Sequence, residues 1–224
     1  KPRDLYKELT AKAHVQADTQ SIVLGFENVL PFASSALSIS ASAADYILYP
    51  VPIFYSDLPN RNGVAFPLNE LVAWNVERGC QAYASWRGMP MHIEHKAEDP
   101  LKAIGIVADV TMSRIKGFGN DQYWKVTCLA AIDRTKRTDI SKRMEEGKLN
   151  TFSMGALVKS FSCGYCHAAA GDCNHISLKR PMDFYSIGGK LVFRCVHGVN
   201  AQELSVVEDP AYGTAIGGDQ LIYT

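Results

Sequence analysis

The sequence lacks any apolar run that approaches the roughly 20 residues needed to cross a bilayer. It also lacks an excess of charge, because 23 Lys and Arg residues balance 23 Asp and Glu residues. Proteins that bind duplex nucleic acid normally carry a basic excess or a basic stripe. We therefore expect neither a membrane nor nucleic acid as a direct partner. Lys1–Thr10 is charged and helix-like rather than a secretory signal, which favours a reducing compartment.

The 224 residues, 47% of them hydrophobic, suffice for one well-buried domain. The order is rich in strands with few helices, which predicts an α+β fold with a mostly antiparallel β core and flanking helices. The expected strands are Ser21–Val29, Asp45–Tyr55, Pro90–Glu94, Ala103–Met112, Gln122–Ile132, Thr151–Ser160, Leu191–Cys195 and Gln202–Val207. The expected helices are Pro67–Trp86 and a short one from Thr138 to Gly147, with a loop at Ser34–Ala44 and a turn at Gly117–Asn120.

Three of the six cysteines lie within eleven positions, beside a histidine, in the pattern Cys163-x2-Cys166-x6-Cys173-x-His175. Four such ligands can close a tetrahedral zinc site, and a site with four protein ligands is structural. His167 and Cys195 are alternative ligands for this site. Cys80 and Cys128 occur in apolar stretches and are expected in the core. We place the zinc knuckle in residues 161–200, as an insertion within a single domain of residues 1–224.

A histidine stands at the end of a predicted strand, at His95. Side chains at strand ends are exposed on a rigid scaffold, so His95 is a candidate general base. A structural surface histidine would have the same local pattern. His92 is expected to point to the opposite strand face and not to cooperate with His95.

A serine followed by a glycine two positions later, Ser153-Met154-Gly155, is a candidate nucleophile on the next strand-rich segment. Serine needs a base and oxyanion donors to react, and Gly155 permits close approach of other groups. Glu203 and Ser205 are two residues apart on a later strand and therefore share one of its faces. From there the Glu203 carboxylate could orient His95. Each pattern, taken singly, is also typical of a serine or a half-exposed charge with no catalytic role.

Three segments together resemble the prohead core proteases of myoviruses and other large tailed phages, relatives of the herpesvirus assemblins. They are GMPMHIEHKAEDPLKAIGIVADV, MEEGKLNTFSMGALV and AQELSVVEDPAYGTA, which cover about half of the chain between Gly88 and Ala215. The resemblance implies a herpesvirus-protease-like β-barrel core. It also implies cleavage, after Glu, of scaffold, major capsid and internal head proteins inside the procapsid in the host cytoplasm, with possible autoproteolysis and homo-oligomerisation.

Carried over by position, the resemblance makes Ser153 the nucleophile and His95 the base of a serine endopeptidase. Glu203 is the first candidate for the third residue, and Asp109 is the second. An S1 pocket that accepts Glu would be expected to contain a basic group. The alternative is a non-enzymatic, zinc-stabilised scaffold or capsid-associated protein with a protease-like fold.

Overall fold

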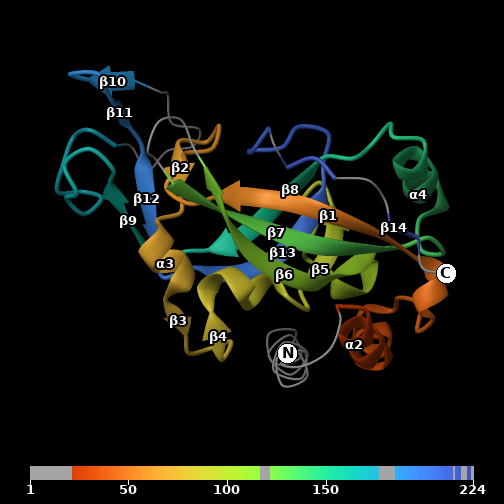
Figure 1. The fold of residues 1–224 in the computed structure, drawn as a ribbon. Helices are drawn as coiled ribbons and strands as arrows, with labels where there is room; N and C mark the ends of the chain where they lie inside the picture. Colours follow the sequence, from red (N-terminus) through yellow and green to blue (C-terminus); the bar gives the residue numbers. More distant parts are fainter. Residues whose placement is uncertain (1–21, 117–121, 177–184, 214, 218–220, 223–224) are drawn as a thin grey trace.

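The computed structural model describes residues 22–116, 122–176, 185–213, 215–217 and 221–222. The expected helical character of Lys1–Thr10 and the expected turn at Gly117–Asn120 lie outside these residues. The protein is α+β and mostly strands, with a long, curled half-barrel sheet at its centre (Figure 1). Among the described residues, no helix combines the length and the apolar character that a membrane span requires.

The central sheet has seven strands in the order β14-β1-β7-β6-β5-β13-β8. Their bounds are β1 Tyr46–Tyr55, β5 Pro90–Ile93, β6 Gly105–Lys116, β7 Gln122–Asp133, β8 Phe152–Leu157, β13 Asn200–Val206 and β14 Leu221–Ile222. Neighbouring strands are antiparallel, except that β13 runs parallel to β5. The prediction of a mostly antiparallel sheet is therefore confirmed.

Smaller elements flank this sheet. They are the strands β2 Val64–Ala65, β3 Trp74–Asn75, β4 Cys80–Gln81, β9 Ser160–Cys163, β10 Tyr185–Ile187, β11 Lys190–Val192 and β12 Arg194–His197, the helices α2 Ile22–Leu37, α3 Leu68–Val72 and α4 Thr138–Glu145, and the 3-10 turns η1 Ala43–Asp45, η2 Ala82–Trp86 and η3 Pro100–Lys102. Strands β2, β12 and β9 form a second sheet, β10 pairs with β11, and β3 pairs with β4.

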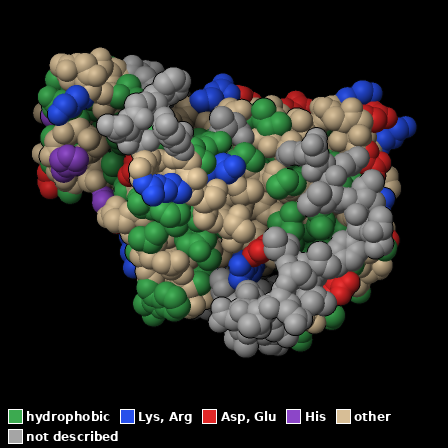
Figure 2. Space-filling view, in the orientation of Figure 1, with side chains coloured by type: hydrophobic (Ala, Val, Ile, Leu, Met, Phe, Trp, Pro, Cys, Tyr) green, Lys and Arg blue, Asp and Glu red, His purple; other side chains and the backbone are tan. Residues whose placement is uncertain are grey.

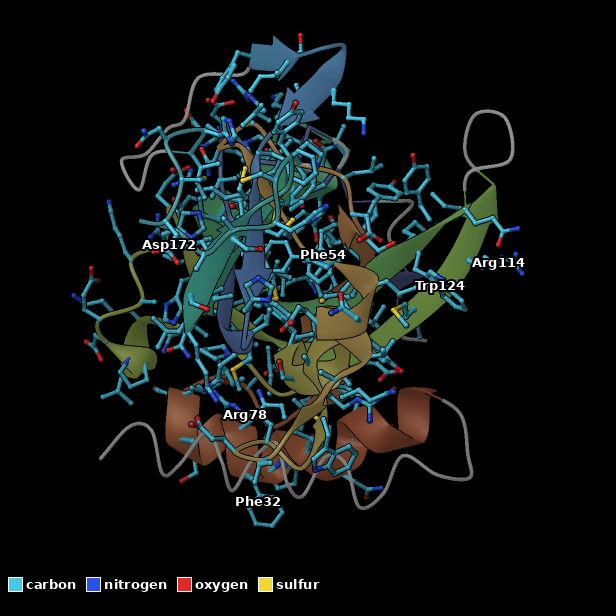
Figure 3. All side chains as sticks on the ribbon, turned by 90° about the vertical axis from the view of Figure 1, so that its left-hand side faces the viewer. Phe32, Phe54, Arg78, Arg114, Trp124 and Asp172 are labelled. Atoms are coloured by element: carbon cyan, nitrogen blue, oxygen red, sulfur yellow. The ribbon has the colours of Figure 1, made fainter. Side chains whose placement is uncertain are left out.

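The main core fills the inner face of the curled sheet. Trp86 and Phe54 are fully buried there, with ring centroids 5.4 Å apart. Phe54 also stacks on Phe66 at 4.8 Å. Figure 3 shows Phe54 in the interior, whereas Arg114 and Trp124 lie toward the far end of the β6–β7 hairpin. Each fully buried aromatic side chain stabilises the fold by about 1.5–3 kcal/mol, so this cluster anchors the sheet.

The N-terminal apolar segment corrects the sequence prediction, because Ser21–Val29 was expected as a strand, whereas its described residues from Ile22 onward form the first half of α2. Phe26, Leu30, Ala33 and Leu37 are buried at four-, three- and four-residue steps, which is the spacing of one helix face. This face packs on the outer side of the central sheet. The tertiary contact decides between strand and helix, since a short apolar run is compatible with both.

The long helix predicted over Pro67–Trp86 is also wrong. Helix α3 ends at Val72, and a β3–β4 hairpin follows, with its turn held by the bond from the Arg78 backbone N–H to the Asn75 side chain. Gly79 supplies the left-handed conformation that this turn needs, at φ 66°. The hairpin leaves Trp74 and Val76 65% and 84% exposed. Figure 2 shows hydrophobic side chains at the lower left, where Figure 1 places β3 and β4.

Candidate active site and metal centre

Three neighbouring strands at one end of the central sheet carry the residues singled out in the sequence. Ser153 lies on β8, Glu203 lies on β13, and His95 follows the end of β5. Strand β13 is the middle strand of the three, so its side chains reach both β8 and the histidine. Across the β13–β8 ladder, Ser205 pairs with Ser153, and Glu203 pairs with Gly155.

The carboxylate of Glu203 holds the ring of His95. The Nδ1 of His95 donates to Oε1 of Glu203 over 2.8 Å. The Glu203 side chain is 5% exposed, whereas that of His95 is 47% exposed. This geometry fixes the proton on Nδ1 and leaves Nε2 as the acceptor, which is the tautomer that a general base requires.

A hydroxyl group fixes the other oxygen of the same carboxylate. Ser205 is fully buried and donates to Oε2 of Glu203 over 2.5 Å. The same hydroxyl accepts the backbone N–H of His95 over 3.2 Å. Ser205 thus positions both the carboxylate and the start of the histidine loop. A buried carboxylate is costly unless it is hydrogen-bonded, and these contacts offset that cost.

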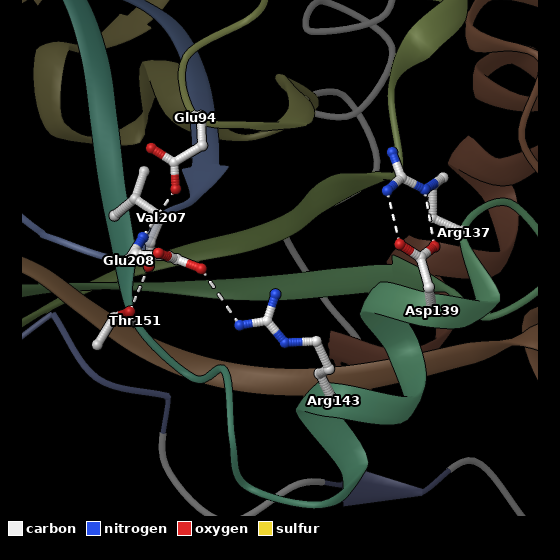
Figure 4. Close-up of polar contacts among 7 residues, drawn as sticks. All are labelled: Glu94, Arg137, Asp139, Arg143, Thr151, Val207 and Glu208. Atoms are coloured by element: carbon white, nitrogen blue, oxygen red, sulfur yellow. Dashed lines mark hydrogen bonds and ion pairs between the residues drawn. The ribbon is translucent and has the colours of Figure 1, made fainter.

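The backbone at His95 adopts an uncommon conformation. Glu94 and His95 are both left-handed, with φ of 51° and 56°. Each such residue costs about 1–3 kcal/mol and persists only where its surroundings enforce it. Here the backbone N–H of Glu208 donates to the Glu94 carboxylate over 2.8 Å, as Figure 4 shows. The bend turns the His95 ring toward Glu203 instead of continuing the strand.

This bend changes the expected relation between the two histidines. His92 pairs in register with Ser205, and the Glu203 charge acts on both His92 and His95. The register places His92 on the face of the sheet that carries Ser205, whereas the sequence predicted the face opposite His95. No hydrogen bond joins the two histidines among the described residues, so the prediction that they do not cooperate is not contradicted. His92 is 1% exposed, burial lowers its pKa, and neither ring nitrogen has a hydrogen-bond partner among the described residues. The His92 ring is therefore expected to be neutral, and it is buried beneath the surface on which His95 is exposed.

Ser153 lines a surface cavity together with His95. The Ser153 hydroxyl forms no hydrogen bond with the His95 ring within the part of the chain that the structure describes. Catalytic hydrogen bonds are often long in a free enzyme and tighten when substrate binds. The structure therefore joins His95 directly to Glu203 and brings Ser153 to the same cavity.

Asp109, the second candidate for the third residue, lies elsewhere. It forms an ion pair with Arg87, and both side chains are mostly buried. That contact engages the Asp109 carboxylate away from His95. Among the two carboxylates considered from the sequence, Glu203 is the one that contacts the His95 ring.

A second serine, histidine and glutamate arrangement was missed by the sequence reasoning. The Ser162 hydroxyl lies 2.7 Å from Nε2 of His197, and Nδ1 of His197 donates to Glu70 over 3.0 Å. The other Glu70 oxygen accepts the backbone N–H of Gly198. These three residues lie on β9, β12 and α3, and none of them lines the cavity at Ser153. Their contacts tie α3 to the second sheet.

The zinc ligands predicted from spacing lie together. Cys163, Cys166, Cys173 and His175 each offer one ligand atom, and these atoms all lie within 4.8 Å of one another. Cys163 is buried, and the backbone N–H of His175 lowers the pKa of the Cys173 thiol, which favours the thiolate that a metal requires. The donor set of three thiols and one imidazole fits zinc.

The other cysteines do not join this cluster. Cys80 and Cys128 are buried in the core, as predicted, and burial raises the pKa of both thiols, that of Cys80 to about 11. Burial also raises the pKa of Cys195 to about 11. Neither Cys195 nor His167 belongs to the group of ligand atoms described above.

Comparisons of the chain with models of protein families, with curated proteins and with solved structures found no match. The chemistry of the site is therefore argued from its own residues.

The hydrogen bond with Glu203 raises the pKa of His95 above 6.5, against the opposing effect of burial. We expect Glu203→Gln to lower this pKa and to move the acid limb of the kcat/KM profile to lower pH. Because the folded-state pKa is raised, the pair stabilises the fold below pH 6.5, and this contribution is lost as the pH rises through the folded-state pKa. Loss of the charge should also reduce kcat roughly 10²- to 10⁴-fold. A titration of His95 by NMR and a pH profile measure both effects, and Asp109→Asn is the matched control that should leave the His95 pKa in place.

The site also explains the glycine two positions after Ser153. A Cβ at Gly155 would lie 2.3 Å from Oε1 of Glu203, so the carboxylate would have to move. We expect Gly155→Ala to break the His95–Glu203 bond, to lower the His95 pKa and to reduce kcat roughly 10²-fold. Gly213→Ala is the matched control, since a Cβ there meets nothing within 4 Å. Equal His95 pKa values in the two variants would contradict this account.

For the metal centre, we expect purified protein to contain about one zinc ion per chain and to lose thermal stability with a strong chelator. Cys163→Ser should lower the zinc content and the Tm, because Cys163 is the buried ligand. Cys128→Ala should lower the Tm without loss of zinc, since Cys128 lies in the core away from the cluster. Metal analysis under reducing conditions makes the measurement. A zinc content near zero in the unmodified chain would rule the site out.

Proposed function

We propose that the protein is a serine endopeptidase in which Ser153 attacks the substrate and His95 is the general base. The observation that carries this proposal is the Glu203-bound His95 ring beside a cavity that Ser153 also lines. A held imidazole with one nitrogen free, next to an accessible serine, is the arrangement that nucleophilic catalysis requires.

In this proposal Glu203 keeps the Nδ1 proton of His95 in place throughout the reaction. Nε2 of His95 takes the Ser153 hydroxyl proton as Oγ attacks the scissile carbonyl. The resulting imidazolium is stabilised by the Glu203 carboxylate and then protonates the leaving amine. A water molecule, activated by the same nitrogen, releases the acyl group and restores Ser153. The oxyanion donors are left unassigned, near Gly155 or on a neighbouring loop.

The proposed substrates are scaffold, major capsid and internal head proteins of a tailed phage, cut inside the procapsid. This part rests on the resemblance of the three sequence segments to prohead core proteases. The placement of the third residue on the strand beside the nucleophile strand is consistent with the herpesvirus-protease-like core that the resemblance implies. The zinc is proposed as structural, because four protein ligands would leave it no open position.

The second candidate function is that of a non-enzymatic, zinc-stabilised scaffold or capsid-associated protein. The observation in its favour is that Ser153 and His95 share a cavity without a hydrogen bond within the described residues. A retained His95–Glu203 bond could then serve only to hold the end of β5 against β13.

The test is Ser153-dependent chemistry. We expect the unmodified chain to react with a fluorophosphonate probe at Ser153 and to cleave a peptide library, and Ser153→Ala to lose both activities. Ser162→Ala is the matched control, because Ser162 has its own histidine and glutamate partners and should leave both activities intact. Loss of cleavage in Ser162→Ala alone would assign the activity to the second arrangement. No labelling and no cleavage in the unmodified chain would favour the non-enzymatic function.

A further inference from the structure

The cavity beside Ser153 and His95 has a volume of about 290 Å³. Much of its wall is apolar, and these side chains come from several elements: Ile53, Val64, Phe66, Phe152, Val158 and Val196. Five of these six side chains belong to the core and are at most 6% exposed. The sixth, Val158, is half-buried and packs against the core. A wall built from packed core side chains is rigid.

Two polar residues of the wall, Asn60 and Tyr212, already have partners of their own. The side-chain oxygen of Asn60 accepts the backbone N–H groups of Asn62 and Val64. The Tyr212 hydroxyl donates to the carbonyl of Leu58. Of the described residues that line the cavity, none is Lys, Arg, Asp or Glu.

Two arginines lie close in the chain to residues of the wall, and neither lines the cavity. Arg61 is exposed and forms an ion pair with Asp209. Arg194 is fully buried, with its guanidinium 5.6 Å from the centre of the Phe161 ring and one N–H donated to the carbonyl of Asn62. Neither arginine is among the residues that line the cavity, although the guanidinium of Arg194 contacts one of them, Asn62.

We infer that this cavity seats an uncharged, apolar side chain of the substrate, in a residue that flanks the scissile bond. The inference rests on the proposed endopeptidase function and gives it a substrate class. A carboxylate in the cavity would lose its hydration without gaining a cation, which costs several kcal/mol. A glutamate that the enzyme required would have to bind outside this cavity.

The rim residue Val158 provides the test. We expect the unmodified full-length chain to cleave a peptide library with Leu, Ile, Met or Phe favoured over Glu by at least about 10-fold at one of the two positions flanking the cut. Val158→Arg places a cation at the cavity and should shift that position toward Glu. Leu157→Arg is the matched control, because this substitution adds the same charge one residue away. Leu157 is 51% exposed and does not line the cavity. It should keep the apolar preference.

A binding measurement with Ser153→Ala separates failure of this inference from failure of the proposed function. Fluorescence polarisation compares a Leu-containing peptide with its Glu counterpart on Ser153→Ala, with and without Val158→Arg. Binding that favours Leu, reversed by Val158→Arg, supports the cavity assignment even if the unmodified chain cleaves nothing.

Ser153-dependent cleavage with Glu favoured at both flanking positions overturns the cavity assignment and leaves the proposed endopeptidase function in place. Loss of a Glu preference in Arg194→Met would then identify Arg194 as the cation. Equal binding of both peptides, with no cleavage, overturns both proposals.

Discussion

The arrangement of the site depends on one buried carboxylate, that of Glu203. Its side chain is 5% exposed, and its two oxygens bind the His95 ring and the Ser205 hydroxyl. An isolated carboxylate at this depth would be protonated or hydrated, so its two partners are a condition of the fold as well as of the chemistry. Of these two partners, the His95 ring reaches solvent and Ser205 does not.

This carboxylate also constrains the backbone on both sides. On β8 it occupies the space where any residue other than glycine would place a Cβ, so this strand must carry Gly155 opposite Glu203. On the other side, His95 reaches the carboxylate only because β5 ends in two left-handed residues. The Glu94 carboxylate, bound by the Glu208 backbone, holds that bend. The strain at His95 is thus offset by a contact with the segment that directly follows β13, the strand that carries Glu203.

Sequence reasoning succeeded where local pattern and tertiary contact agree. Asp45–Tyr55 and Gln122–Ile132 are long β-branched and aromatic runs, and they form β1 and β7 almost as predicted. The four zinc ligands are close in sequence, so their spacing alone brought them together. The errors arose where distant contacts decide, as in α2, which is helical against the outer face of the sheet, and at His95, whose left-handed conformation has no signal in its neighbours. Gly155 was expected to permit a close approach to its backbone, and the group that approaches it is the Glu203 side chain.

The metal centre and the cavity are linked by one strand. Cys163 on β9 pairs in register with Arg194 on β12, and Val196, two residues further on the same face, lines the cavity. Glu203 lies in the other sheet, on β13, which begins after the turn at Gly198. A metal that fixes Cys163 therefore acts first on the position of β12 and the apolar wall. Loosening this centre would alter the shape of the cavity before it disturbed the His95–Glu203 bond, which β5, β13 and β8 hold without contribution from the knuckle.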